Sequence, residues 1–348
     1  MTLRAIAALS LVVVLAGADK PSRPLDIYFI DAMGGAATLV VTPGGESVLI
    51  DSGWPGNDDR DPKRIEQVVR DQAGLDHLDH LVTTHWHTDH YGGVAGLVRR
   101  LRIDHFWDRG LPDPKAPDGD RANYPDGPFA GDALGEAYRR ASEGKRRPLD
   151  AGDSLPLRGV EALVLASGGR VIASPAGPPN PLCAGAPADL PADRSDNARS
   201  LALRFRLGAF DFLDCGDLTW NVEKQLACPA DKVGPIDVFQ VTHHGMDISN
   251  HPTLLRTIAP TVAIMNNGPR KGGAPATVKL LRSIPSIEAA YQLHKNAATP
   301  AEDNAEAALV ANPDRAGGRF IRVSVRPDGA SYTVKIGADG PERSWKSR

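Results

Sequence analysis

The chain has 348 residues, of which 41% are hydrophobic and 24% are charged. This is enough apolar material to bury one large core or two modest ones in a globular protein. Its formal net charge of -3 does not support a protein held on nucleic acid by charge alone, although it does not forbid a nucleic-acid substrate.

The first eighteen residues, MTLRAIAALSLVVVLAGA, join one positive charge at Arg4 to an apolar run that ends in Ala-Gly-Ala. This pattern predicts a secretion signal over residues 1–18, with a mature protein that starts near Asp19 in a secreted or periplasmic location. The alternative is a transmembrane anchor. It is disfavoured because the run is shorter than the ~20 residues that span a bilayer, so we expect no stable membrane insertion once the signal is removed.

The N-terminal half shows short apolar runs separated by glycine-rich turns. The elements it predicts are strands over 25–32, 36–43 and 47–53, a helix over 61–74, a strand over 77–85 and a helix over 92–101. A histidine-rich stretch lies between the last two. It therefore sits on a loop at the carboxyl end of a strand, where α/β proteins commonly place ligands.

Residues 108–150 are rich in Pro, Gly and Asp and predict a surface insertion or lid, with a helix over 131–144. The later elements predicted are a strand over 160–167, a Pro-rich loop over 174–195, a hairpin over 200–217, a strand over 237–245, a helix over 252–259, a strand over 261–268, a helix over 276–284, and strands over 319–326 and 331–337. Because no repeat or long linker divides the chain, we expect one domain over 19–348 with an insertion at about 108–150.

Three cysteines allow at most one disulfide within the chain. Cys183 and Cys228 lie in Pro/Ala-rich stretches typical of loops, so they are the pair we favour in an oxidising compartment. Cys215 ends an apolar run, which favours a small buried thiol.

The stretch THWHTDHYGG, residues 84–93, places His85, His87, Asp89 and His90 within six positions. Residues two apart on an extended loop point the same way, so His85 and His87 can converge on one cation. Asp89 and His90 then turn toward a second cation beside it. Isolated histidines are usually surface or core residues, but four ligand-type side chains at a strand-to-helix turn predict a metal site. Imidazole and carboxylate suit zinc, and also manganese or iron.

Two other strand ends offer further ligands. Asp217 closes FDFLDCGD, where a carboxylate can bridge two cations; its alternative role is to cap the turn after Gly216. In VTHHG we predict His243 as a metal ligand. We predict His244 as a catalytic proton donor or as the group that stabilises negative charge on the substrate.

Several segments occur in the order of a known family: YFIDAMGGAATLV, VLIDSG, the H-x-H-x-D-H motif, DNARSLALRF, FLDCGD and VTHHGMDIS. Together they span residues 25 to about 270 and resemble the metallo-β-lactamase fold hydrolases, in the branch that includes the hydrolase domain of ComEC-type DNA-uptake proteins. The resemblance implies an α/β fold, a four-layer αββα sandwich. It also implies two divalent metal ions at the edge between the sheets and a bridging hydroxide that attacks an ester, amide or phosphodiester, with Asp89 as a catalytic residue.

The chain also departs from the family pattern. The third histidine that many members use for the first metal is missing, because His105 is the only histidine in 91–216 and a strand or core role is expected for it. The first metal would then be completed by Asp196, Asn197 or water. The family's GQG is Gly34-Gly35 here, and GPRKGGAP lacks a later histidine.

The expected activity is hydrolysis by a metal-activated water, which needs no serine or cysteine nucleophile. The sequence has no G-x-S-x-G elbow, P-loop or dinucleotide fingerprint either. The ComEC-like segments favour a phosphodiester in a small-molecule or oligomeric substrate. The run YRRASEGKRR, with Lys145, Arg146 and Arg147, could approach phosphate, although such a run is also typical of a solvated helix face. The alternatives are a β-lactam, a lactone or another ester, and a catalytically inactive metal-binding envelope protein.

Overall fold

The computed structural model describes residues 23–113, 115–116, 119–173, 178–314 and 317–348. The predicted secretion signal at 1–18 lies outside these residues. Within them, no helix combines the length and the apolar character needed to cross a membrane.

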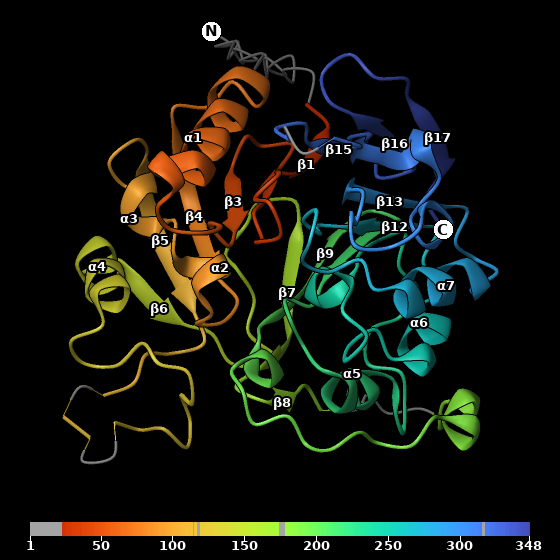
Figure 1. The fold of residues 1–348 in the computed structure, drawn as a ribbon, viewed down its shortest axis with the longest axis horizontal. Helices are drawn as coiled ribbons and strands as arrows, with labels where there is room; N and C mark the ends of the chain where they lie inside the picture. The colour runs from red at the N-terminus through yellow and green to blue at the C-terminus, as the bar shows by residue number, and fades with distance from the viewer. Residues whose placement is uncertain (1–22, 114, 117–118, 174–177, 315–316) are drawn as a thin grey trace, which may run out of the picture.

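Two mixed β-sheets form the centre of the described chain (Figure 1). The first has the spatial order β17-β16-β15-β1-β2-β3-β4-β5-β6, with β1 (Leu25–Phe29), β2 (Thr38–Val41), β3 (Ser47–Ile50), β4 (His77–Thr83), β5 (Arg102–Asp108), β6 (Arg146–Pro148), β15 (Ile321–Val325), β16 (Ser331–Ile336) and β17 (Arg343–Lys346). The second has the order β14-β13-β12-β11-β10-β9-β7-β8, with β7 (Glu161–Ser167), β8 (Arg170–Val171), β9 (Ala202–Leu207), β10 (Phe210–Asp214), β11 (Val238–Gln240), β12 (Val262–Met265), β13 (Ala289–His294) and β14 (Val310–Asn312).

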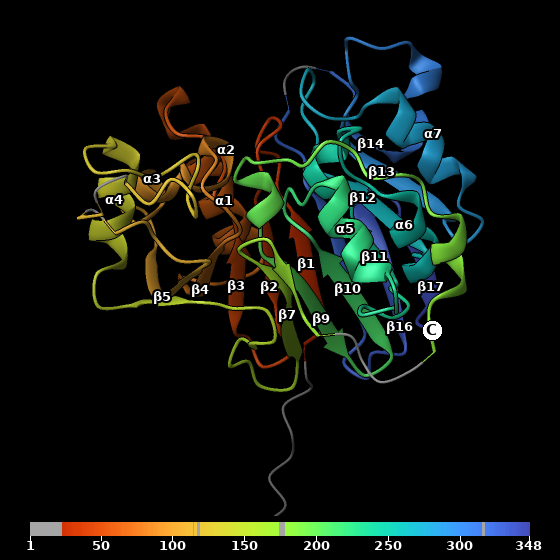
Figure 2. The same cartoon turned by 90° about the horizontal axis from the view of Figure 1, so that it is seen from below.

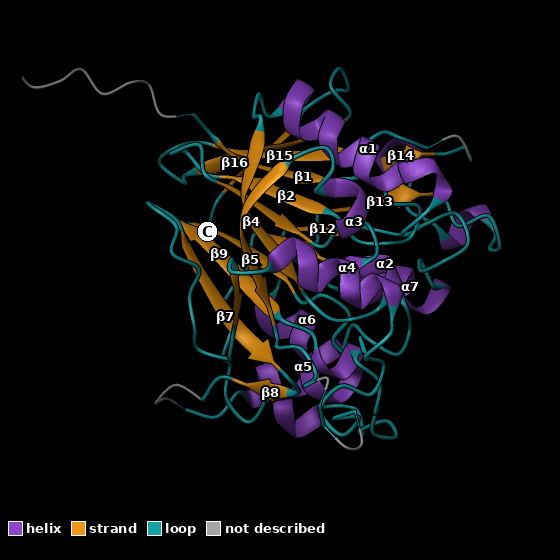
Figure 3. Ribbon diagram, turned by 90° about the vertical axis from the view of Figure 1, so that its left-hand side faces the viewer, coloured by secondary structure: helices purple, strands orange, loops and turns teal. Residues whose placement is uncertain are grey.

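Helices cover the outer face of each sheet. They are α1 (Arg60–Gln67), α2 (Thr88–Tyr91), α3 (Val94–Leu97), α4 (Ala133–Ser142), α5 (Trp220–Ala227), α6 (Pro252–Ile258) and α7 (Pro275–Ser283). Figure 2 shows α1, α3 and α4 on one side of the two sheets and α5, α6 and α7 on the other. Figure 3 looks onto the first of these helical layers. The predicted αββα sandwich is therefore confirmed.

Three apolar clusters hold these layers together. One lies between the sheets and joins residues such as Phe29 of β1 to Phe212 of β10, whose rings meet edge to face at 5.8 Å. A second packs the first sheet against α1, α3 and α4, and a third packs the second sheet against α5, α6 and α7. Burial of these side chains is the main favourable contribution to folding.

The topology brings separate strand ends to one edge. Strands β3, β4 and β5 run parallel in the first sheet, and β10, β11 and β12 run parallel in the second. The carboxyl ends of parallel strands lie on the same side of a sheet, so the loops after β4, β10 and β11 can meet. These loops carry the predicted metal ligands.

Element boundaries differ from the sequence prediction at two places near this edge. The helix expected over 92–101 is shortened to α3, and part of the histidine-rich stretch expected as a loop forms the short helix α2. The strand expected over 237–245 ends at Gln240, because His243 and His244 adopt left-handed backbone angles with φ of 55° and 53° that a strand cannot contain. Strand β5 contains His105, as expected; its ring is exposed and stacks on that of His80.

Cys183 and Cys228 form a disulfide that joins residues 45 positions apart, while Cys215 is a buried free thiol. Replacing both bridged cysteines by serine is expected to lower the free energy of unfolding by about 2–4 kcal/mol, because the bond restricts the unfolded chain. Urea unfolding of the oxidised protein and the double variant measures this difference. The same midpoint for both proteins would contradict the expectation.

Glu223 of α5 is fully buried and accepts a hydrogen bond from the backbone N–H of His251 at 2.9 Å. Burial raises the pKa of its carboxyl to about 7. The folded chain therefore retains a proton that the unfolded chain loses near pH 4.5, so this contribution to stability is complete below that pH and is lost as the pH rises through about 7.

Glu223→Gln is expected to reduce the loss of stability between pH 5 and pH 8, by on the order of 3 kcal/mol at the upper limit. Denaturant unfolding at both pH values measures the effect. The exposed Glu143, replaced in the same way, is the control and is expected to leave the pH dependence as it is. An E223Q variant with the parental pH dependence would show that this carboxyl does not titrate with folding.

Candidate metal centre

The loop after β4 is fixed by one buried carboxylate. Asp51, which follows β3 with a φ of 62°, accepts hydrogen bonds from the backbone N–H and the hydroxyl of Thr84, both at 2.8 Å. Its Oδ2 atom also lies 2.7 Å from Nδ1 of His90. Asp51 thus joins the start of the loop to the histidine six residues later and sets the direction in which that imidazole points.

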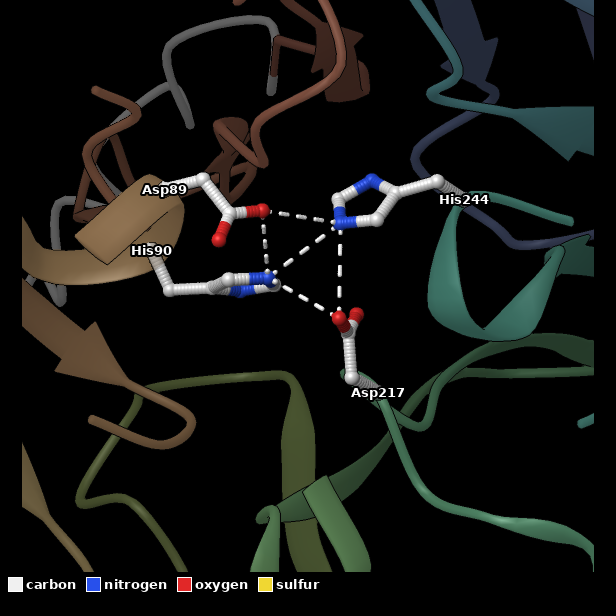
Figure 4. A group of neighbouring side chains, drawn as sticks. All are labelled: Asp89, His90, Asp217 and His244. Atoms are coloured by element: carbon white, nitrogen blue, oxygen red, sulfur yellow. Dashed lines mark hydrogen bonds and ion pairs between the residues drawn. The ribbon is translucent and has the colours of Figure 1, made fainter. Parts of the chain in front are cut away.

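Four buried side chains from separate strand ends converge beyond this loop (Figure 4). They are Asp89, His90, Asp217 and His244, and each offers one ligand atom within 4.8 Å of the other three. The Nε2 atom of His90 lies 3.2 Å from Oδ2 of Asp217 and 3.3 Å from Oδ2 of Asp89. The Nε2 atom of His244 lies 3.4 Å and 3.2 Å from the same two oxygens. This arrangement suits one metal ion.

Asp217 also faces a second set of nitrogens. Its Oδ2 atom is 3.4 Å from Nε2 of His243 and 4.0 Å from Nε2 of His85. The latter nitrogen is buried and has no hydrogen-bond partner, which is unusual for a polar atom removed from water. Asp217 Oδ2 therefore lies between two groups of imidazoles.

The Nδ1 atoms of His85, His90, His243 and His244 each face an oxygen acceptor. Nδ1 of His90 faces Asp51, Nδ1 of His244 lies 3.3 Å from the carbonyl of Asn266, and Nδ1 of His243 lies 3.1 Å from the Ser249 hydroxyl. That hydroxyl donates to the carbonyl of Leu218, so it accepts from His243. Nδ1 of His85 is likewise 3.1 Å from the Thr84 hydroxyl, which donates to Asp51.

When Nδ1 carries the proton of a neutral imidazole, Nε2 presents a lone pair. The four acceptors therefore turn Nε2 of His85, His90, His243 and His244 inward as metal-binding atoms. Acceptors of this kind are typical outer partners of histidine ligands. The donor set of the described residues thus fits a divalent metal.

The charges in this cluster are strongly coupled. Burial opposes charge on His90, but the carboxylates of Asp217, Asp89 and Asp51 around it raise its pKa well above the usual range. Burial also opposes charge on Asp217, yet the surrounding histidines hold its pKa well below the usual range. His243 is different, because burial lowers its pKa to about 4 and keeps the ring neutral. The pKa of Asp89 is also held well below its usual range, against the effect of burial, by His90 and His244. Asp89 and Asp217 therefore remain anionic in a buried site and attract a cation strongly.

Three of the predicted site residues have contacts that differ from the core of the cluster. Nε2 of His87 lies 3.0 Å from Oδ2 of Asp126, in the segment that precedes α4, and its ring centroid is 4.7 Å from that of His85. Asp196 forms a buried ion pair with Arg109 and accepts the backbone N–H of Trp86 at 2.6 Å. Its Oδ2 atom therefore holds the loop between His85 and His87, while its Oδ1 atom is engaged by Arg109.

Asn197 contacts one of the predicted ligands directly. Its amide nitrogen is 3.4 Å from Nε2 of His243, and its amide oxygen is buried without a hydrogen-bond partner. An amide in this position can contact a ligand of the cluster. Arg146, by contrast, lies in β6 and pairs with the buried Asp108 at 2.6 Å, so it belongs neither to a helix face nor to the cluster.

The turn that carries His243 and His244 has a strained backbone. Two consecutive non-glycine residues with positive φ cost of order 1–3 kcal/mol each, and such strain persists where the surroundings enforce it. Gly272 lies against this turn, where a Cβ atom would approach the carbonyl oxygen of His244 to 2.0 Å. The loop after β12 therefore packs directly on the turn that presents both imidazoles.

Asp51→Asn tests whether this carboxylate sets the direction of His90. The change keeps the size of the side chain but removes the charge that faces Nδ1, so metal affinity is expected to fall about 10–100-fold. Competition with a chelator measures the affinity. Asp211→Asn, which alters a buried carboxylate paired with Arg206 at 2.9 Å outside the cluster, is the control. Equal affinities for the two variants would contradict the role of Asp51.

Comparison with known proteins gives one family match and several similar structures. Residues 30–181 match the family model of the metallo-beta-lactamase superfamily. No match to a curated protein sequence was found. Among solved structures, the metallo-beta-lactamase fold protein YhfI from Bacillus subtilis is similar at 11% identity with a TM-score of 0.44, covering 77% of this chain and 95% of that one.

Two further structures are similar. A variant of the CmlA beta-hydroxylase matches at 16% identity with a TM-score of 0.44, over 80% of this chain and 53% of that one, so this chain spans about half of its length. The metallo-beta-lactamase SMB-1 matches at 14% identity with a TM-score of 0.35, over 78% of this chain and 80% of that one.

Proposed function

We propose that this chain, whose residues 30–181 match the family model of the metallo-beta-lactamase superfamily, is a metal-dependent hydrolase that uses two divalent cations, with zinc as the first choice. The observation that carries the proposal is the position of Asp217 Oδ2 between two sets of inward-facing Nε2 atoms. Asp89, His90 and His244 would hold one cation and His85 and His243 the other, with Asp217 shared. His87 would join the second set if its side chain turned from Asp126.

This assignment extends the ligand set expected from the sequence. His243 supplies the nitrogen that the missing third histidine would have provided, and His244 acts as a ligand rather than a proton donor. Two cations in these positions would lower the pKa of a bound water toward ~7 and polarise a substrate oxygen. The chain itself orients both sets of imidazoles. The Nδ1 atoms of His85, His90, His243 and His244 each face an oxygen atom of the surrounding chain.

The substrate class that we propose is a phosphodiester. The sequence segments resemble those of the ComEC-type branch, and Asn197 offers a buried amide beside His243 for a substrate oxygen. The Cys183–Cys228 disulfide and the apolar N-terminal run support an exported enzyme that works in an oxidising compartment. The sequence likeness to ComEC-type proteins is the reason for preferring a phosphodiester to a β-lactam or a lactone.

The test compares three substrates with one preparation of metal-loaded protein. We expect hydrolysis of bis-p-nitrophenyl phosphate that stops when a chelator removes the metal and returns when zinc or manganese is added. Nitrocefin and a simple lactone are expected to be poor substrates. Faster opening of nitrocefin would contradict the phosphodiester assignment, and a protein that binds metal but cleaves none of the three would support the inactive metal-binding alternative.

A further inference from the structure

A lysine from the loop after β12 reaches into the metal cluster. The Nζ atom of Lys271 contacts Oδ2 of Asp89, and the ammonium also lies 5.3 Å from the centre of the Trp54 ring. A turn closed by the hydrogen bond from Gly268 N to Lys271 O, at 2.8 Å, positions this side chain. None of the sequence motifs around the metal ligands includes this residue.

The oxygen that Lys271 contacts is the one that faces the metal position. Asp89 Oδ2 lies 3.3 Å from Nε2 of His90 and 3.2 Å from Nε2 of His244, so it belongs to the group of four converging ligand atoms. An ammonium and a divalent cation on the same carboxylate oxygen repel each other strongly in a buried site. The two are therefore competitors for Asp89.

The side chain of Lys271 can move away from Asp89 when a metal binds this oxygen. The side chain of Lys271 is 32% exposed, whereas that of Asp89 is only 7% exposed, so the ammonium lies at the mouth of the cluster. Gly272 and Gly273 follow it with positive φ values of 75° and 62°. The indole face of Trp54 offers a second favourable contact for a cation.

We propose that Lys271 is a movable cation that neutralises Asp89 before the metal binds and afterwards holds the anionic group of the substrate beside Trp54. The substrate class that this implies carries a negative charge, as phosphate or carboxylate, next to the scissile bond. This inference rests on the proposed hydrolase function for its second step only. The first step, competition for Asp89, concerns the metal-free chain.

The first measurement is metal affinity. Titration of metal-free protein with zinc in the presence of a competing chelator is expected to show that Lys271→Met tightens the weaker binding step by about tenfold or more, because the competing charge is gone. Lys271→Arg keeps the charge and is expected to bind as the parent does. Arg270→Met removes the neighbouring exposed cation and is the matched control.

The second measurement is anion binding by the zinc-loaded proteins. Calorimetric titration with inorganic phosphate and with acetate is expected to show weaker binding of at least one anion to K271M, and the anion affected identifies the group recognised. In turnover, the KM for bis-p-nitrophenyl phosphate is expected to rise about tenfold or more in K271M, while the KM for the neutral p-nitrophenyl acetate stays within about twofold.

Unchanged zinc affinity in K271M, or unchanged binding of both anions, would overturn the proposal. Equal KM increases for the charged and neutral esters would overturn it as well. If the parent protein hydrolyses neither ester, the proposed function fails, but the zinc and anion titrations still decide the role of Lys271.

Discussion

Asp217→Ala is expected to abolish binding of both metals and to lower kcat/KM by at least about 10³-fold. Its Oδ2 atom lies within 3.4 Å of Nε2 of His90, His243 and His244, so removing the carboxylate leaves both sets of imidazoles without their shared anion. Metal content by mass spectrometry of the purified variant and hydrolysis of bis-p-nitrophenyl phosphate measure the two effects.

The control for this change is Asp214→Asn. Asp214 is also buried, near the same strand end, and accepts the backbone N–H of Gly216 at 2.8 Å, a bond that the asparagine oxygen can retain. Burial raises the pKa of Asp214 to about 7, so a neutral side chain is tolerated there. We expect this variant to keep its metals. A D217A protein that still binds two equivalents would show that Asp217 is not a bridging ligand.

Arg109→Met is expected to lower the free energy of unfolding by about 3–5 kcal/mol, because it leaves the carboxylate of Asp196 buried without its cation. The side chains of this ion pair are 2% and 0% exposed, and Arg109 Nε also lies 3.3 Å from Asp196 Oδ2. Since Asp196 holds the backbone N–H of Trp86, we expect the loop between His85 and His87 to loosen and turnover to fall.

Two further variants separate the ion pair from other effects. Arg109→Met combined with Asp196→Asn removes both charges and is expected to recover part of the loss, as a double-mutant cycle measures. Arg206→Met breaks a more exposed pair with Asp211 and is expected to cost about 0–1 kcal/mol. An R109M variant as stable as R206M in urea would contradict a structural role for Asp196 and return it to the set of possible metal ligands.

The sequence predicted the layers of the fold and the centre of the site because both depend on local pattern. Short apolar runs marked most strands, and the spacing of His85, His87, Asp89 and His90 indicated a metal-binding loop. Strands β13 and β14 were missed, although AAYQLH at β13 contains buried apolar residues, because β14 has only three residues and the pattern around both is weak.

The sequence could not predict which distant residues hold the metal-binding histidines in place. Asp51 was visible in VLIDSG as part of a family-like segment, but its contact with His90 depends on the pairing of β3 with β4. The sequence also could not show that both His243 and His244 face the metal site, because consecutive residues of a strand point to opposite sides. The left-handed turn presents both to Asp217, a backbone choice that apolar periodicity does not encode.

The most direct test is a crystal structure of the zinc-loaded protein with anomalous scattering recorded on both sides of the zinc edge. We expect two peaks that share Asp217 Oδ2, one bound by Asp89, His90 and His244 and the other by His85 and His243. A zinc-saturated crystal with no peak beside Asp217, or with peaks only at other side chains, would contradict it.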